Sequence, residues 1–327
     1  GLLLKLLHLH VPFDIIVMFS YWFQHTYGLI NWKGVVSDTF FIKSGIRQGG
    51  VCSTWFFNIY INDLILILRD KGFGCYLFGE FAGCIFYADD IILMSASLKQ
   101  LQVMLDVCSQ YASDNELVFN STKSYGIVFG KVLNLDALAV LTISSKPIKW
   151  VPSCLYLGIR LVSGKYFVTD YEDRKRKFFV AVNNIVTNAK GLSEECIIEL
   201  IVKQCLPVLM YGCGNWCSNS ESKRRVSVCF NRVIRRVFKY NDYESVKGIL
   251  YGFGILPIDL HIIKTRLCLT GNALKSERIL LRKCAEWNRT RNMCITDLLR
   301  FNISYNLCKG NIVKQIWANF SHIMNWS

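Results

Sequence analysis

Hydrophobic periodicity divides the chain into two halves of different character. In the first half, short segments rich in β-branched and aromatic residues alternate with segments of helical period, whereas from about residue 171 the pattern is helical only. The later part is expected to form helices at about 172–189, 193–211, 220–239 and 257–276. This order predicts an α+β fold, with an antiparallel sheet backed by helices and then an all-helical region.

The pattern of the first half also gives approximate element positions. A helix is expected over 12–28, with Pro12 at its start and Asp14 in its first turn, where an acid favours the helix dipole. The other expected elements are strands at 29–36 and 39–42 joined by a turn at 37–38, helices at 55–69 and 98–115, and strands at 117–119, 125–129, 139–143 and 155–161.

The most unusual stretch lies at residues 83–94, where two adjacent carboxylates separate two apolar runs. Strands are predicted at 85–87 and 91–93, and Ala88, Asp89 and Asp90 are typical of a tight turn between them. Adjacent acids in such apolar company would be costly to bury unpaired. The residues alone leave two interpretations open, which are a solvated turn and a cation site.

A glycine-rich loop precedes the helix predicted at 55–69. Its residues Arg47, Gln48 and Gly49 bring a charge, an amide and an exposed backbone to one place. A glycine loop that leads into a helix N-terminus is typical of phosphate binding. Such loops are also frequent without that function, so the motif alone does not establish a phosphate site.

The basic charge is concentrated in one half of the chain. Residues 1–150 hold 11 basic and 11 acidic side chains, so the whole net charge of +14 lies in residues 151–327. On the helix predicted at 220–239, the four basic residues with helical spacing are Arg225, Arg232, Arg236 and Lys239, beside an apolar stripe of Val226, Phe230, Val233 and Val237. A face of one sign favours a polyanionic ligand, and a solvated face with counterions is the alternative.

The remaining composition excludes several classes of protein. There are 14 Cys but no C-x-x-C pair, which favours reduced buried thiols over a zinc site. The leucine-rich start is interrupted by Lys5, and no uncharged run of about 18 apolar residues follows, so no membrane partner is expected. We therefore expect an intracellular protein, nuclear or cytoplasmic. Because the chain starts at Gly1, we expect a piece of a longer product.

The order of five motifs carries a resemblance to a known family. The motifs are Ser44–Gly50, Phe56–Leu64, Tyr87-Ala88-Asp89-Asp90, Phe119-Asn120-x-x-Lys123-Ser124 and Tyr156-Leu157-Gly158. Together they resemble the reverse transcriptases of non-LTR (LINE-type) retrotransposons. The resemblance implies a partial polymerase palm at 1–165 and a helical, thumb-like basic domain at 166–276. A C-terminal helical extension is expected at 277–327.

The resemblance also implies an activity, which is RNA-directed DNA polymerisation from an RNA template, a DNA primer and dNTP. Asp89 and Asp90 would be the metal ligands and would hold two Mg²⁺ ions, with Mn²⁺ as a possible substitute. Lys123 would protonate the leaving pyrophosphate. The loop with Arg47, Gln48 and Gly49 would contact the incoming nucleotide and the template. The strand at 155–158 would brace the primer end.

One departure from the family concerns a third catalytic carboxylate, which the family carries on a strand upstream of Gly1. Phe13-Asp14 imitates that motif, but its place after Pro12 makes Asp14 a first-turn helix acid instead. We therefore expect an N-terminally truncated fragment that is inactive in isolation. The alternatives are a non-catalytic remnant that binds nucleic acid through its basic half and, more remotely, an intron maturase. The coding sequence upstream of Gly1 would separate the enzyme from the remnant.

Overall fold

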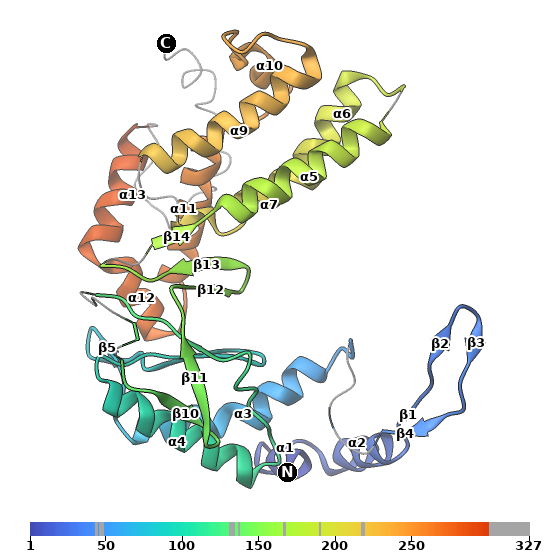
Figure 1. Cartoon of the computed structure of the whole chain (residues 1–327), viewed down its shortest axis with the longest axis vertical. Helices are drawn as coiled ribbons and strands as arrows, with labels where there is room; N and C mark the ends of the chain where they lie inside the picture. Colours follow the sequence, from blue (N-terminus) through green and yellow to red (C-terminus); the bar gives the residue numbers. More distant parts are fainter. Residues whose placement is uncertain are drawn as a thin grey trace. The chain divides into compact units, whose positions relative to one another are not determined.

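The computed structural model of the protein describes most of the chain, which divides into two compact units (Figure 1). The first unit comprises residues 1–126 and 136–149, and the second comprises residues 127–135 and 150–327. The described residues are 1–42, 45, 49–130, 135–136, 138–165, 168–189, 191–216 and 220–300.

The first unit mixes helices with short strands, as the periodicity predicted. Its helices are α1 (Leu2–His8), α2 (Phe13–Gln24), α3 (Ser53–Asp70) and α4 (Leu98–Asp114). Its strands are β1 (Tyr27–Gly28), β2 (Asn31–Trp32), β3 (Val35–Val36), β4 (Phe40–Phe41), β5 (Tyr76–Leu77), β6 (Glu80–Phe81), β7 (Cys84–Tyr87), β8 (Asp90–Leu93), β9 (Tyr125–Gly126), β10 (Leu141–Ile143) and β11 (Lys146–Trp150). The antiparallel pairs are β1–β4, β2–β3, β5–β6, β7–β8 and β10–β11, and β9 lies on the other side of β11.

Helices α3 and α4 form the support of the β7–β8 hairpin. Their apolar faces bury Leu64, Leu68 and Met104 in one cluster, because these positions recur at helical spacing. Phe86 of β7 and Ile91 of β8 pack on the same cluster. A rigid helical layer therefore underlies the hairpin and fixes the position of its turn.

A pair of side-chain hydrogen bonds ties β10 to the same helical layer. The Gln102 side chain on α4 accepts a hydrogen bond from the Thr142 backbone N–H at 2.9 Å and donates one to the Thr142 carbonyl oxygen at 3.0 Å. An amide side chain can satisfy both groups of one residue in this way. The edge of the small β10–β11–β9 sheet is thus fixed to α4.

The second unit begins with strands and continues as helices. Its strands are β12 (Ser153–Tyr156), β13 (Ile159–Val162) and β14 (Val168–Asp170), which pair antiparallel in that order. Its helices are α5 (Glu172–Asn188), α6 (Glu194–Leu200), α7 (Leu206–Met210), α8 (Cys213–Trp216), α9 (Ser220–Phe238), α10 (Lys247–Gly252), α11 (Ile258–Leu274), α12 (Ile279–Glu286) and α13 (Asn288–Arg300). The expected α+β class is confirmed, and the four long helices expected in this half lie close to their predicted ranges.

The helix expected at 193–211 contains an irregular turn. Residues Ile201–Cys205 between α6 and α7 adopt π-helical geometry. Pro207 lies in the first turn of α7, and because proline has no N–H, it cannot complete the regular ladder of hydrogen bonds at this point. The buried core of the second unit continues through this turn and includes Phe178, Ile201 and Phe230.

Four local predictions about strands and turns were wrong in whole or in part. The turn expected at 37–38 lies instead at Lys33-Gly34, between β2 and β3, where the φ angles are 51° and 87°. The single strand expected at 155–161 is a hairpin, because Leu157 and Gly158 form its turn with φ angles of 44° and 73°. Two consecutive residues with positive φ match the twist of two-residue hairpins. Residues 117–119 form no strand, and only Tyr125–Gly126 of the range 125–129 does.

Within the described ranges, we find no helix with the length and apolar character needed to cross a membrane.

Candidate functional site

The two adjacent carboxylates lie at the tip of the β7–β8 hairpin, as the sequence predicted. The strands pair antiparallel with Tyr87 opposite Asp90, which leaves Ala88 and Asp89 as a two-residue loop. Ala88 has a φ of 50°, a conformation that a residue with a Cβ adopts only at some cost. The Asp89 and Asp90 side chains are both exposed. The hairpin, which packs on α3 and α4, therefore presents two carboxylates to solvent on one short turn.

The donor chemistry of this turn suits a hard divalent cation. Asp89 and Asp90 offer carboxylate oxygens, which are the ligands that Mg²⁺ and Mn²⁺ prefer. Among the residues that the structure describes, no group of three or more His, Cys, Asp or Glu is arranged to hold a metal ion. The turn thus fits one side of a Mg²⁺ site, and the described residues show no third ligand beside it.

Asp14 occupies the position expected from the sequence. It lies in the first turn of α2, with Pro12 as the residue that precedes the helix, and its side chain is exposed. A carboxylate there interacts favourably with the unpaired N–H groups of the helix start. The interpretation of Asp14 as a first-turn helix acid is confirmed.

The other predicted residues of the first unit have varied outcomes. Lys123 is exposed and lies in a turn where the Asn120 side chain accepts hydrogen bonds from the backbone N–H groups of Thr122 at 3.0 Å and Lys123 at 3.3 Å. Gly49 has a φ of 78° and open space around it, so its backbone is accessible. Arg47 and Gln48 lie outside the described residues. The roles of Lys123, Arg47, Gln48 and Gly49 stay predictions.

Sequence reasoning missed a partly buried lysine that joins α1, α3 and α4. The Lys5 ammonium lies 2.7 Å from an Asp63 carboxylate oxygen, and donates hydrogen bonds to the Tyr60 carbonyl at 2.6 Å and the Tyr111 hydroxyl at 3.0 Å. Burial lowers the pKa of Lys5, but the hydrogen bonds to Asp63 and Tyr111 outweigh it, so the pKa is raised above its usual value. A lone lysine in an apolar helix was the available signal, and it was interpreted only as an interruption.

A second missed group of residues fixes the β12–β13 turn in the second unit. The Arg174 guanidinium donates a hydrogen bond to the Gly158 carbonyl and lies 4.2 Å from the centre of the Tyr211 ring. The Tyr211 hydroxyl donates to the Leu157 carbonyl at 3.0 Å. Both turn carbonyls are therefore held by side chains from α5 and from the end of α7. We call these four residues the turn clamp.

The same hairpin is joined to α5 by an ion pair. An Arg160 nitrogen on β13 lies 2.7 Å from an Asp173 carboxylate oxygen. The Arg160 hydrogen bond, together with the nearby charges of Arg160 and Arg176, lowers the pKa of the Asp173 carboxyl below its usual value. Together with the turn clamp, this ion pair anchors the β12–β13 hairpin to α5.

The basic face predicted on the helix at 220–239 is confirmed in part. Arg225, Arg232 and Arg236 are exposed on α9, and the expected apolar stripe beside them faces the core. Arg236 donates a hydrogen bond to the Asn183 side-chain oxygen of α5 at 2.7 Å. Lys239 does not continue the helical face, because α9 ends at Phe238 and Lys239 has a φ of 57°. Of the four basic residues predicted for this face, the three arginines therefore lie on the helix.

One comparison with known proteins bears on this geometry. Residues 7–161 match the family model described as reverse transcriptase (RNA-dependent DNA polymerase). The matched range begins in α1, ends in β13 and contains the whole β7–β8 hairpin. Over these residues the chain is similar to reverse transcriptases, which agrees with the resemblance that the motifs carry. No curated protein matches the chain.

Proposed function

We propose that the chain is part of the reverse transcriptase of a non-LTR (LINE-type) retrotransposon, a polymerase that copies an RNA template from a DNA primer. The observation that carries the proposal is the β7–β8 hairpin. Within a reverse transcriptase domain, a turn of Ala88 and Asp89 on an apolar strand pair presents two exposed carboxylates. Asp is also common in solvated turns, so the match to the reverse transcriptase model is what favours the metal-site interpretation.

The proposed roles follow from the needs of phosphoryl transfer. When bound, two Mg²⁺ ions about 4 Å apart would activate the primer hydroxyl and hold the leaving phosphates. Asp89 and Asp90 would supply oxygen ligands from the hairpin tip. Lys123, exposed at its turn, would give a proton to the leaving pyrophosphate. Arg47, Gln48 and Gly49 would contact the incoming dNTP and the template.

The same chemistry makes a third carboxylate necessary. One hairpin cannot place ligands on opposite sides of two ions, and Asp14 lies on a different element, as an exposed acid in the first turn of α2. We therefore propose that residues 1–327 do not extend a primer by themselves. A non-catalytic remnant is the second candidate. The observation that favours it is that no cluster of three metal-ligating residues occurs in the described ranges.

Primer extension on an RNA template with Mg²⁺ or Mn²⁺ tests this proposal. We expect no incorporation by residues 1–327. We expect incorporation by a longer product that includes the in-frame upstream segment, and we expect Asp89→Asn to abolish it, since loss of a metal ligand costs several orders of magnitude in rate. A longer product that stays inactive favours the remnant. Incorporation by residues 1–327 that disappears in Asp14→Ala would show that Asp14 is the third ligand.

A further inference from the structure

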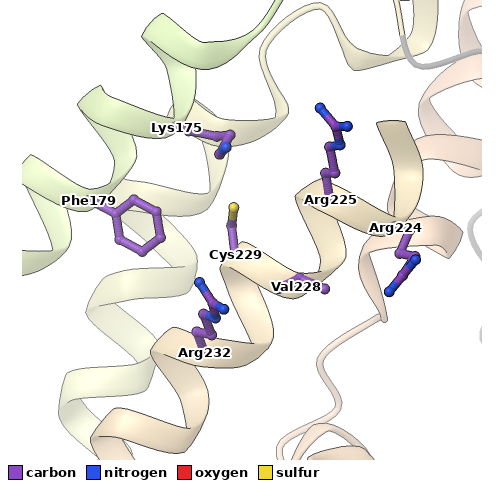
Figure 2. A pocket seen from close by; sticks show the side chains of 7 residues that line it. All are labelled: Lys175, Phe179, Arg224, Arg225, Val228, Cys229 and Arg232. Atoms are coloured by element: carbon purple, nitrogen blue, oxygen red, sulfur yellow. The ribbon is translucent and has the colours of Figure 1, made fainter. Parts of the chain in front are cut away.

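A pocket of about 380 Å³ lies between α5 and α9 of the second unit (Figure 2). Its size is that of a small-molecule or nucleotide site. The residues that line it are Lys175, Phe179, Arg224, Arg225, Val228, Cys229 and Arg232. The pocket shares Arg225 and Arg232 with the exposed arginine face of α9, but α5 contributes Lys175 and Phe179 to it as well.

The lining combines a cationic rim with an apolar floor. Four of the seven lining residues are Lys or Arg and none is acidic. Figure 2 shows the Lys175 ammonium, the Phe179 ring and the Arg232 guanidinium around the same opening, with the Cys229 thiol between them. Lys175 is oriented by Glu172, whose carboxylate oxygens lie 2.9 Å away. Arg232 is exposed, and among the described residues no carboxylate lies within 4 Å of it.

The floor is neutral under ordinary conditions. Burial raises the pKa of the Cys229 thiol, and the opposing effects of Lys175 and Arg232 are smaller. Val228 and Phe179 are the other two apolar residues that line the pocket, and the Phe179 ring offers a flat apolar face. A cationic rim above an aromatic floor is the combination that binds single strands of nucleic acid, with phosphates at the rim and bases against rings.

We infer that this pocket holds one nucleotide of a single-stranded nucleic acid. Its phosphate would lie between Lys175 and Arg232, and its unpaired base would lie against Phe179. A duplex cannot use the floor, because its bases are paired and stacked inside the helix. This inference rests on the proposed function only in taking nucleic acid as the partner, and it adds that the partner is unpaired at this point.

Fluorescence anisotropy with a 12-nucleotide RNA and with an RNA–DNA duplex of the same sequence tests the inference. Phe179→Leu removes the ring and leaves every charge. We expect it to weaken single-strand binding about tenfold, as removal of a stacked base commonly does, and to leave duplex binding within about twofold. Arg232→Gln should lower the slope of log affinity against log salt for the single strand by about 0.7.

A matched control separates the pocket from general charge. Arg176 lies on α5 beside Lys175, has a side chain that is 76% exposed, pairs with Asp173 at 3.1 Å and does not line the pocket. Arg176→Gln removes the same charge as Arg232→Gln, and we expect a smaller loss of single-strand affinity. Because Arg232 is exposed, its replacement should not impair folding. For Phe179→Leu, a cooperative unfolding transition verifies that the variant is folded.

The outcomes distinguish this inference from the proposed function. Equal weakening of the single strand and the duplex by Phe179→Leu, or no weakening of either, would overturn the pocket as a nucleotide site while nucleic-acid binding stands. Arg176→Gln and Arg232→Gln with equal effects on the single strand would also overturn it. A wild-type chain that binds neither nucleic acid would refute both the pocket and the proposed basic binding surface.

Discussion

Substitution of Gly158 by Ala tests how firmly the turn clamp holds the β12–β13 hairpin. Gly158 has a φ of 73°, and a Cβ placed there would lie 2.5 Å from an Arg174 guanidinium nitrogen. The added methyl group therefore acts twice. It forces a residue with a Cβ into the left-handed region, and it displaces the guanidinium from the Gly158 carbonyl and from the Tyr211 ring.

The magnitude can be worked out from these two effects. A left-handed conformation costs a residue with a Cβ about 1–2 kcal/mol. A hydrogen bond to a charged group contributes about 1.5–3 kcal/mol, and a partly exposed cation–π interaction contributes about 0.5–1 kcal/mol. Because the displaced Arg174 regains water, we expect Gly158→Ala to destabilise the hairpin by about 3 kcal/mol in total.

Two further variants separate the effects. Gly191 has a φ of 89° and nothing within 4 Å of an added Cβ, so Gly191→Ala carries the conformational cost alone. Arg174→Met removes the clamping guanidinium, and in that background Gly158→Ala should cost only about 1–2 kcal/mol. The two substitutions at the clamp should therefore be strongly non-additive, since they remove the same interaction.

Native-state hydrogen exchange of the amides of β12 and β13 is the appropriate assay, because it reports local opening in a chain with two units. We expect Gly158→Ala to speed exchange there by about two orders of magnitude, since each 1.4 kcal/mol is about tenfold. The clamp would be refuted if Gly158→Ala and Gly191→Ala raised the exchange rates of their own segments equally. It would also be refuted if the free-energy costs of Gly158→Ala and Arg174→Met were additive.

Two other predictions concern the partly buried lysine and the basic helix. Because the pKa of Lys5 is raised in the folded state, its contribution to stability is complete below the unfolded pKa of about 10.4 and is lost as the pH rises through the folded value. The free energy of unfolding, measured in urea, should therefore fall above that pH by more in the wild type than in Lys5→Met. At neutral pH, Lys5→Met should cost about 1–2 kcal/mol, since Asp63 is half exposed and can be hydrated. Replacement of Arg225, Arg232 and Arg236 by Ala should reduce the salt slope of duplex binding by about 0.9 for each phosphate that is no longer bound, and an unchanged slope in a salt titration would exclude this face as the docking surface.

The elements that the sequence predicted well are those decided by local pattern. The two β-branched and aromatic runs on either side of Asp89 and Asp90 were sufficient to predict both strands and the turn. The apolar stripe of α9 was likewise sufficient for its orientation. Attention to glycine positions would have corrected the predicted positions of two turns. Gly34 and Gly158 are each the second residue of a two-residue turn in which both residues have a positive φ.

The features that the sequence could not predict depend on interactions between distant residues. Lys5 meets Tyr111 across 106 positions, and Tyr211 meets Leu157 across 54. No periodicity encodes such pairs, because each side chain satisfies its own helical or strand pattern equally well without its partner. The pocket between α5 and α9 was missed for the same reason, since Lys175 and Phe179 come from a different helix than Arg232.

The most direct test of the central claim is to map where a divalent ion binds. Fe²⁺ can replace Mg²⁺ at oxygen ligands and, with ascorbate and peroxide, cleaves the backbone close to where it is bound. The experiment is performed with template–primer and dNTP bound, and mass spectrometry locates the cuts. We expect cleavage centred on residues 87–91 that Mg²⁺ suppresses and that Asp89→Asn with Asp90→Asn abolishes. The same cleavage in the double variant, or none at the hairpin, would contradict the assignment of Asp89 and Asp90 as the metal ligands.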